Sequence, residues 1–111
     1  MKSLYYHATP YRNLYSIMQN GIKPSADGFV KLCHCKEDAV IFGVDKGLDD
    51  DGEHFVVFAV MLDMDDVESY QEQSLLSVVP IHCFRYKGKI LPEYIASYLS
   101  DLHFYNYSAS M

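Results

Sequence analysis

The segment Phe55–Leu62 constrains the fold of this chain more than any other. Its eight residues, Phe-Val-Val-Phe-Ala-Val-Met-Leu, include no polar side chain. A strand with one face in water alternates apolar and polar residues, whereas an unbroken apolar run of this length indicates a strand covered on both faces. The run is also far shorter than the roughly 20 residues of a membrane-spanning helix. We therefore expect Phe55–Leu62 to be the central strand of a sheet.

Length and composition limit what can surround this strand. The chain has 111 residues, 50% of them hydrophobic and 22% charged, which predicts one packed domain over residues 1–111 with a loose tail at 104–111. Nine Lys and Arg against fifteen Asp and Glu give a formal charge of −6. Because sequence-independent nucleic-acid binding needs a basic face, this balance argues against it. The lack of an apolar signal region at the N-terminus predicts a cytoplasmic protein without a membrane partner.

Strands and helices are expected to follow one another in an α+β order. A short aromatic strand over Leu4–Tyr6 leads into a helix over Pro10–Asn20, with Thr9 placed to cap its start and Gly21 placed to end it. Apolar residues recur at helical spacing in this helix, so one side of it is expected to pack on the core.

The same reasoning applies to the middle and the end of the chain. Phe29–Cys35 predicts a strand with alternate residues on opposite faces, and Lys36–Gly43 predicts a short helix. Leu75–Phe84 predicts a strand region that Pro80 interrupts. A C-terminal helix is expected from Leu91 onward, because its apolar residues recur at helical spacing: Ile95, Tyr98, Leu99 and Leu102.

Four short motifs, taken in order, resemble one known family. They are His7-Ala8-Thr9 at the end of the first strand, the helix register with Leu14, Ile17, Gly21 and Ile22, the helix start Lys36-Glu37-Asp38-Ala39, and the ending Gly88-Lys89-Ile90-Leu91-Pro92-Glu93-Tyr94-Ile95. Together they resemble the ADP-ribosyltransferase-like fold, in particular the small bacterial and phage transferases and RNA 2′-phosphotransferase. The resemblance implies a small split antiparallel β-sheet with flanking helices, and a cleft that binds NAD as a substrate.

The resemblance also implies roles for individual residues. His7 would hydrogen-bond the nicotinamide ribose, and Thr9 would help to close the same pocket, with Tyr15 contributing beside them. A rigid strand end can present an imidazole and a hydroxyl to a sugar without either group having to move. At the position of Lys31, which would also border the cofactor, the family commonly has Tyr, which stacks on the nicotinamide ring, or His. A lysine cannot stack in the same way, and it brings positive charge beside a cationic ring.

A catalytic glutamate completes the implied site. In the family it lies at the start of a later strand, where it holds a ribose hydroxyl and stabilises the oxocarbenium ion that forms as nicotinamide leaves. Glu72 best matches this position, ahead of the strand expected near Leu75, and Glu68 is the other candidate. An ordinary surface carboxylate is the alternative interpretation of either residue. If the resemblance holds, His7 and Glu72 are expected to face each other across one cleft.

Two function hypotheses follow. In the first, the chain is an NAD-dependent ADP-ribosyltransferase that transfers ADP-ribose to a protein or nucleic-acid acceptor, with His7 and Glu72 as its catalytic residues. In the second, it is a catalytically inactive interaction or inhibitor module on the same fold that binds a protein partner. The pair His7 and Thr9 favours the first hypothesis, and Lys31 favours the second.

The three cysteines are expected to be reduced and free of metal. An odd number of cysteines in a chain without a secretory signal argues against a disulfide framework. Cys33-His34-Cys35 and His82-Cys83 together contain enough zinc ligands, but their spacing is unlike that of structural zinc sites. In a strand, Cys33 and Cys35 would share one face about 7 Å apart, whereas His82 and Cys83 would point to opposite faces.

Overall fold

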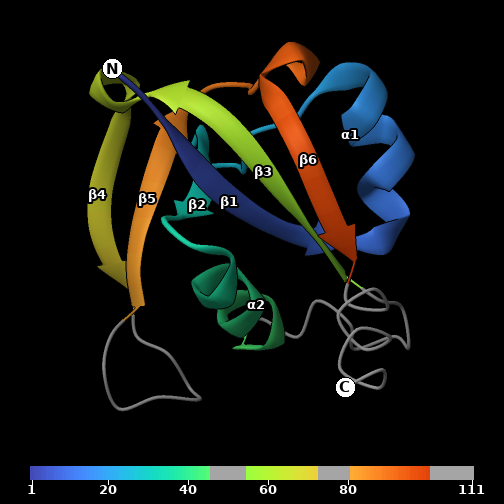
Figure 1. Cartoon of the computed structure of the whole chain (residues 1–111), viewed down its shortest axis with the longest axis horizontal. Coiled ribbons are helices and arrows are strands. Elements are labelled where there is room, and N and C mark those ends of the chain that lie inside the picture. Colours follow the sequence, from blue (N-terminus) through green and yellow to red (C-terminus); the bar gives the residue numbers. More distant parts are fainter. Residues whose placement is uncertain (46–54, 73–80, 101–111) are drawn as a thin grey trace.

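The computed structural model describes residues 1–45, 55–72 and 81–100, which form a six-stranded antiparallel sheet with two short helices (Figure 1). The strands are β1 (Lys2–Pro10), β2 (Phe29–Cys33), β3 (Phe55–Asp63), β4 (Val67–Glu72), β5 (Ile81–Lys87) and β6 (Ile95–Ser100), and they lie in the order β4-β5-β2-β1-β3-β6. The helices are α1 (Leu14–Asn20) and α2 (Lys36–Asp45), with 3₁₀ turns at Tyr11–Asn13, Met64–Asp66 and Pro92–Tyr94. This arrangement confirms the expected α+β class with an antiparallel sheet and flanking helices.

The apolar strand β3 lies inside the sheet, as its sequence predicts. It pairs with β1 on one side and with β6 on the other. Every side chain from Phe55 to Val60 is buried, as is Leu62, while Met61 is exposed. Both faces of this strand are therefore covered along most of its length, which explains why its sequence shows no alternation of apolar and polar residues.

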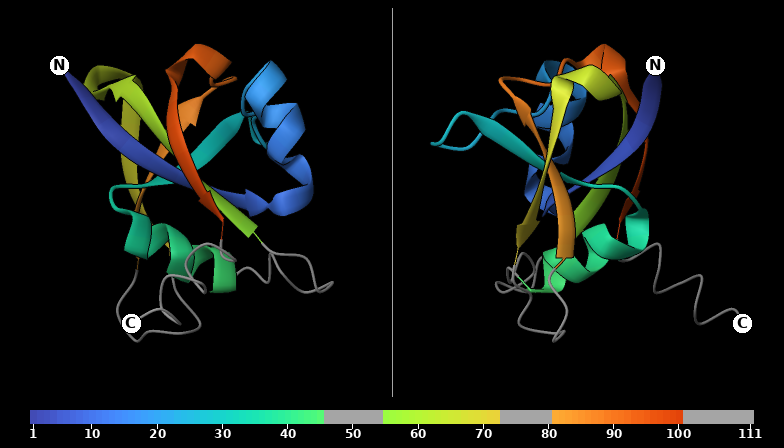
Figure 2. Two further views of the ribbon diagram at one scale, coloured as in Figure 1. Left: turned by 45° about the vertical axis from the view of Figure 1, so that its right-hand side comes forward. Right: turned by 90° about the vertical axis from the view of Figure 1, so that its left-hand side faces the viewer.

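The two faces of the sheet carry separate apolar clusters. The larger cluster consists of Tyr5, Leu14, Ile17, Ile22, Val30, Leu32, Val56, Phe58, Val60, Leu62 and Ile90. The smaller cluster consists of Ala8, Cys33, Ala39, Phe55, Val57 and Cys83. Alternate residues of β3 enter different clusters, and α1 contributes to the larger cluster while α2 contributes to the smaller one. The helices therefore pack on different faces of the sheet (Figure 2).

The first strand is longer than expected, and the helix after it is shorter. β1 continues to Pro10, and the 3₁₀ turn separates it from α1, so the expectation of a helix over Pro10–Asn20 is wrong at its start. Thr9 does not cap this helix, because its hydroxyl instead accepts a hydrogen bond from Asn13 Nδ2 at 2.9 Å. β1 extends because each of its residues pairs with β3, and this ladder outweighs the local helix signal of Thr9-Pro10.

The expected C-terminal helix is wrong, because Ile95–Ser100 forms the strand β6. β6 pairs with β3, and a bulge between Ala59 and Val60 leaves one residue of β6 without a direct partner. The extra residue brings Ile95 and Tyr98 to the same face although they are three positions apart, a spacing that also occurs on a helix. The ring of Tyr98 lies 6.0 Å from the ring of the core residue Phe58. The bulge thus allows a strand to have apolar residues three positions apart on one face, which is the spacing that predicted a helix.

The remaining expectations have mixed outcomes. The strand expected over Phe29–Cys35 and the following helix are confirmed, although the strand ends at Cys33 and the helix extends to Asp45. β4 was not expected at all, and β5 begins only at Ile81. The segment 75–80 and the tail 104–111 lie outside the described residues. No helix in the described part of the chain is long and apolar enough to cross a membrane.

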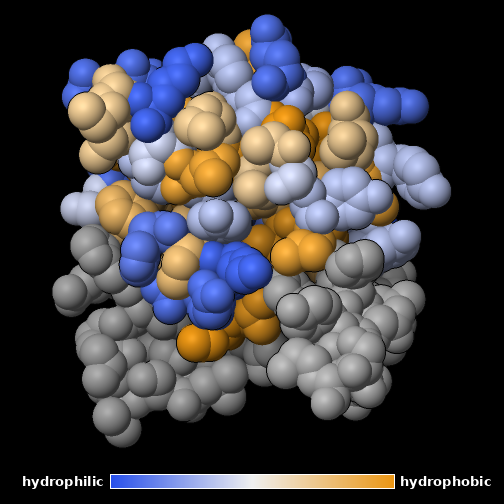
Figure 3. Space-filling view, viewed as in Figure 1, coloured by the Kyte–Doolittle hydropathy of each residue, from blue (hydrophilic) through white to orange (hydrophobic). Residues whose placement is uncertain are grey.

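Exposed apolar residues are scattered among polar ones on the side of the molecule seen in Figure 3. Among the described residues, the large apolar side chains with substantial exposure come from several elements, for example Leu4 of β1, Ile41 of α2, Met61 of β3 and Tyr98 of β6. Leu4 and Met61 are direct partners in the β1–β3 ladder, so these two exposed side chains are neighbours on the sheet.

Candidate functional site

Strands β1 and β2 separate almost as soon as they meet. They pair at Tyr6 and Cys33 alone, whereas β1 pairs with β3 along its whole length. His7, the next residue of β1, spans the opening, and its Nδ1 lies 2.8 Å from the main-chain carbonyl oxygen of Lys31. A side chain thus makes a hydrogen bond between strands where the backbone ladder has ended.

Two neighbouring cavities flank this opening and share His7, Thr9 and Lys23. The smaller, of about 250 Å³, is lined by His7, Thr9, Asn13, Ser16, Ile17, Gly21, Ile22 and Lys23. The larger, of about 430 Å³, is lined by His7, Ala8, Thr9, Pro10, Lys23, Ser25, Lys31 and Phe42. Because three residues line both cavities, we treat the two as one site and call it the His7 cleft.

His7 offers a hydrogen-bond acceptor to this cleft. Burial lowers the pKa of His7, against the opposing effect of the hydrogen bond to the Lys31 carbonyl, and so favours the neutral ring. Because a carbonyl oxygen can only accept, Nδ1 carries the proton and donates it. The other ring nitrogen, Nε2, then carries a lone pair. A neutral His7 in this tautomer can accept a hydrogen bond from a ligand hydroxyl.

Thr9 offers a donor beside that acceptor. Its side chain is buried, and its oxygen accepts the hydrogen bond from Asn13 Nδ2, which leaves the hydroxyl proton to be donated elsewhere. His7 and Thr9 are two residues apart on β1, so they lie on one side of the strand roughly 7 Å apart. Each is also held by a hydrogen bond within the protein. The cleft therefore presents an ordered acceptor and an ordered donor.

Gly21 shapes the end of the smaller cavity. It ends α1 with a φ of 86°, and a Cβ at this position would collide with the carbonyl oxygen of Ile90. Directly after it, Ile22 and Ile90 exchange two backbone hydrogen bonds of 2.8 and 3.0 Å. Only glycine lets the chain leave α1 this close to Ile90. This turn brings Lys23 to the cleft.

The structure brings together three of the residues predicted for the site. His7, Thr9 and Lys31 line the His7 cleft. Tyr15 lies on α1 with 77% of its surface exposed and lines neither cavity. Glu72 is the last residue of β4 rather than a residue ahead of the next strand, and β4 lies three strands away from β1.

The sheet register keeps Glu72 away from His7. Tyr6 of β1 and Tyr70 of β4 belong to one row of paired residues that runs through β2 and β5. Glu72 lies two residues beyond this row in one direction, and His7 lies one residue beyond it in the other. Three strand spacings amount to about 14 Å, and three residues of offset add about 10 Å along the strands. The expected single cleft with His7 and Glu72 on facing walls is not formed.

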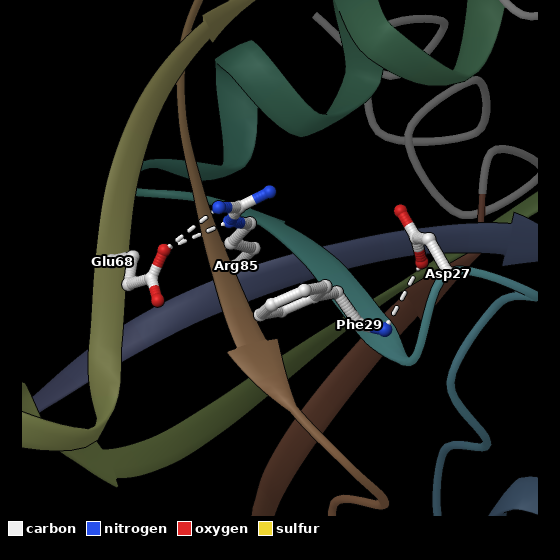
Figure 4. A network of polar contacts seen from close by, with 4 residues as sticks. All are labelled: Asp27, Phe29, Glu68 and Arg85. Carbon is white, nitrogen blue, oxygen red and sulfur yellow. Dashed lines mark hydrogen bonds and ion pairs between the residues drawn. The ribbon is translucent and has the colours of Figure 1, made fainter.

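Glu68, the other candidate glutamate, is engaged on the sheet surface. Its carboxylate accepts a hydrogen bond from Arg85 Nε at 3.0 Å and lies 2.9 Å from Nη2 (Figure 4). The guanidinium also lies 4.2 Å from the centre of the Phe29 ring, and Asp27 accepts a hydrogen bond from the main-chain nitrogen of Phe29 at 3.0 Å. Exposed ion pairs of this kind stabilise little. They do, however, direct Glu68 toward β5 and not toward the cleft.

The zinc set considered from the sequence is not assembled in the described residues. Cys33 is buried directly opposite Cys83, and the thiol–thiol hydrogen bond together with burial raises the pKa of Cys33 far above its usual range. Cys35 lies beyond the end of β2 and does not share a strand face with Cys33. The side chain of His82 lies outside the described residues. Cys33 and Cys83 are therefore buried members of the smaller apolar cluster, where they pack as small apolar side chains.

A smaller group of potential metal ligands lies at the start of α2. The donor atoms of His34, Cys35 and Asp38 lie within 4.8 Å of one another, and His34 Nδ1 is 3.4 Å from Asp38 Oδ2. Burial raises the pKa of Cys35, which favours the thiol over the thiolate that binds metal. When His34 is protonated, its contact with Asp38 is an ion pair, and this pairing is enough to explain why these side chains lie close together.

Sequence reasoning missed several residues of the cleft, among them Asn13, Ser16, Lys23 and Ser25. Asn13 reaches back to Thr9 because a 3₁₀ turn, and not an α-helix, follows β1. Lys23 and Ser25 lie in the segment after Gly21, which has no periodic pattern from which a position could be predicted. The Gly21 turn signal was present, but a turn signal does not give the direction of the chain beyond it.

Two comparisons with known proteins found no relative of this chain. No protein-family model matches the chain, and no curated protein matches it. Support for a function therefore comes from the short motifs of the sequence and from the chemistry of the His7 cleft.

Proposed function

We propose that the protein binds a nucleotide of the NAD class in the His7 cleft, as a domain with the ADP-ribosyltransferase-like fold. The lining of the cleft carries this proposal. Its described residues supply an imidazole, three hydroxyls, an amide and two ammonium groups, and none of them has a carboxylate. The whole chain, in contrast, has a formal charge of −6. A ligand with phosphates and sugar hydroxyls matches this local reversal of charge.

The polar groups of the cleft suit a ribose. Nε2 of His7 can accept a hydrogen bond from one sugar hydroxyl, and the Thr9 hydroxyl can donate to another oxygen. Both side chains are already held, by the Lys31 carbonyl and by Asn13. Binding therefore spends little free energy on ordering them, which favours affinity for a small ligand.

The two cavities also suit a dinucleotide in size. Ligand pockets in proteins have volumes of roughly 300–1,000 Å³. The smaller cavity, of about 250 Å³, borders His7, Thr9 and α1, and the larger, of about 430 Å³, borders the two lysines. A sugar in the first with the rest of the nucleotide in the second would use both.

We propose that this binding occurs without transfer of ADP-ribose. Breaking the bond between nicotinamide and ribose builds positive charge on the sugar, which a nearby carboxylate stabilises in an active transferase. The described lining of the cleft offers no such group. Glu72 is three strands away, and Glu68 pairs with Arg85. The protein is then a nucleotide-recognition module, which shares with the second sequence hypothesis the lack of catalysis but not the protein partner.

Calorimetric titration with NAD and ADP-ribose, combined with an assay of nicotinamide release, tests this proposal. We expect binding of the wild type, and a roughly tenfold or greater loss of affinity in His7→Gln, because a hydrogen bond to the ligand is lost. His34→Gln is the matched control, since this exposed histidine lies outside the cleft. Absence of binding at millimolar nucleotide contradicts the proposal. Nicotinamide release that depends on His7 contradicts binding without transfer and restores the enzyme hypothesis.

A further inference from the structure

Two lysines from different segments border the larger cavity of the cleft. Lys31 comes from β2, and Lys23 comes from the segment between α1 and β2. None of the described residues in that lining is acidic, so no negative charge of the lining compensates the two lysines. A ligand part that enters this cavity therefore meets a lining with two lysines and, among its described residues, no acidic side chain.

The strand next to Lys31 adds positive charge and not negative charge. Lys31 is paired directly with Arg85 of β5, so two positive side chains stand opposite each other. Like charges in this position repel. Arg85 already pairs with Glu68 and covers the ring of Phe29 (Figure 4). Glu68, the acidic residue next to this pair, is thus engaged by Arg85, while Lys31 borders the larger cavity.

We infer that the His7 cleft discriminates between nucleotides by charge, and that it prefers reduced NAD or ADP-ribose to oxidised NAD. The inference rests on the proposed function and names the ligand class within it. The oxidised nicotinamide ring carries a positive charge, so oxidised NAD as a whole is one unit less negative than reduced NAD or ADP-ribose and is attracted less by Lys23 and Lys31. The reduced ring is uncharged, and ADP-ribose lacks the ring. Phe42, which also borders the larger cavity, adds the apolar surface that suits an uncharged ring.

Oxidised and reduced NAD make a direct test, because they have nearly the same size and differ chiefly in the charge of one ring. Their dissociation constants are measured by calorimetry at low salt, with ADP-ribose as the third ligand. We expect reduced NAD and ADP-ribose to bind roughly tenfold more tightly than oxidised NAD. This is the size of effect that two charge contacts in a partly hydrated cavity should have on a dissociation constant. Molar salt should shrink this ratio toward one, because salt screens these charge interactions.

Lys31→Gln removes the charge while keeping most of the side chain, and it should lower the ratio to roughly threefold, because Lys23 remains. Lys23→Gln tests the same charge effect from a segment outside the sheet, so the inference remains testable even if one variant folds poorly. Lys87→Gln is the control, because this exposed lysine lies on β5 outside both cavity linings.

The outcomes separate the inference from the proposed function. Equal affinities for the three ligands, or tighter binding of oxidised NAD, overturn the inference while the proposed function stands. A preference that is undiminished in both lysine variants also overturns it. If none of the three ligands binds, the proposed function itself falls.

Discussion

Strand β1 lies between β2 and β3, and it pairs with these two strands over very different lengths. With β3 it forms a continuous ladder from Lys2 to Pro10, whereas with β2 it pairs only at Tyr6 and then diverges. His7 and Phe58 are direct partners in the β1–β3 ladder. Phe58 is completely buried, whereas His7 borders the cavities that open on the β2 side.

The comparison shows how one strand can serve stability and binding at once. Pairing with β3 fixes the backbone of β1. Where β1 separates from β2, the polar side chains of His7 and Thr9 border a cavity. A binding group on a rigid strand loses little entropy when a ligand arrives. The backbone hydrogen bonds lost on the open side are partly replaced by His7, which bonds to the Lys31 carbonyl.

Phe58→Ala should be the largest single disruption of the paired side. We expect it to lower the free energy of unfolding by about 3–5 kcal/mol, because it removes a large aromatic ring from the core. Urea unfolding followed by circular dichroism measures the loss. The control is His7→Ala at the partner position, for which we expect about 1 kcal/mol from the loss of one hydrogen bond. Equal losses in the two variants would contradict the difference between the two sides of β1.

Gly21→Ala should damage the support of the cleft by a smaller amount. A methyl group there meets the carbonyl oxygen of Ile90, and the φ of 86° is unfavourable for alanine as well. Gly28→Ala is the matched control, since Gly28 has a φ of 88° but nothing within 4 Å of an added Cβ. We expect about 1 kcal/mol for Gly28→Ala from the backbone alone, and at least about 2 kcal/mol for Gly21→Ala. Thermal unfolding compares them, and a smaller loss in Gly21→Ala would refute the close contact.

The pH dependence of stability should report on His7 with a still smaller effect. Burial lowers its pKa from the ordinary 6.5, so below that pH the unfolded chain binds more protons than the folded protein. The contribution of His7 is therefore complete above about pH 7 and is lost progressively as the pH falls below 6.5. His7→Gln cannot titrate, so its unfolding free energy should fall less than that of the wild type between pH 7.5 and 5. Parallel curves for the two proteins would show that His7 is not buried as a neutral ring.

Glu72→Gln should have the smallest effect of all. Because Glu72 ends β4, three strands from β1, we expect the nucleotide affinity of this variant to equal that of the wild type within error. Calorimetric titration with ADP-ribose checks this. A large loss of affinity would mean that Glu72 reaches the cleft and that the first sequence hypothesis places it correctly.

Much of the sheet interior could be predicted from the sequence, because burial leaves a direct mark on composition. Phe55–Leu62 contains no polar residue and is an internal strand, and the alternation in β2 places Val30 and Leu32 in the core. β4 and β6 were missed for different reasons. β4 combines polar and apolar residues with little contrast, and the bulge in β6 gives Ile95 and Tyr98 a helical spacing.

The site was predictable only where a local signal marks it. The run His7-Ala8-Thr9 before a turn identified two residues that do border one cleft. The position of Glu72 depended on where the following strand begins, and sequence alone did not show that β4 precedes it. Lys23 reaches the cleft through a turn at Gly21, so its place depends on tertiary geometry that no periodicity encodes.

The strand order also determines when the sheet can form. β1 leaves the ribosome first, but its long partner β3 begins only at Phe55, and β5, the outer neighbour of β2, begins at Ile81. Pairing between such distant segments requires long loops to close, which slows folding compared with a helical protein of the same size. Until β3 is synthesised, the nine residues of β1 have no partner on the β3-facing edge, and the segment also carries the aromatic side chains Tyr5 and Tyr6. A fragment that stops before Phe55 lacks β3 and therefore leaves this edge unpaired, and we expect it to aggregate.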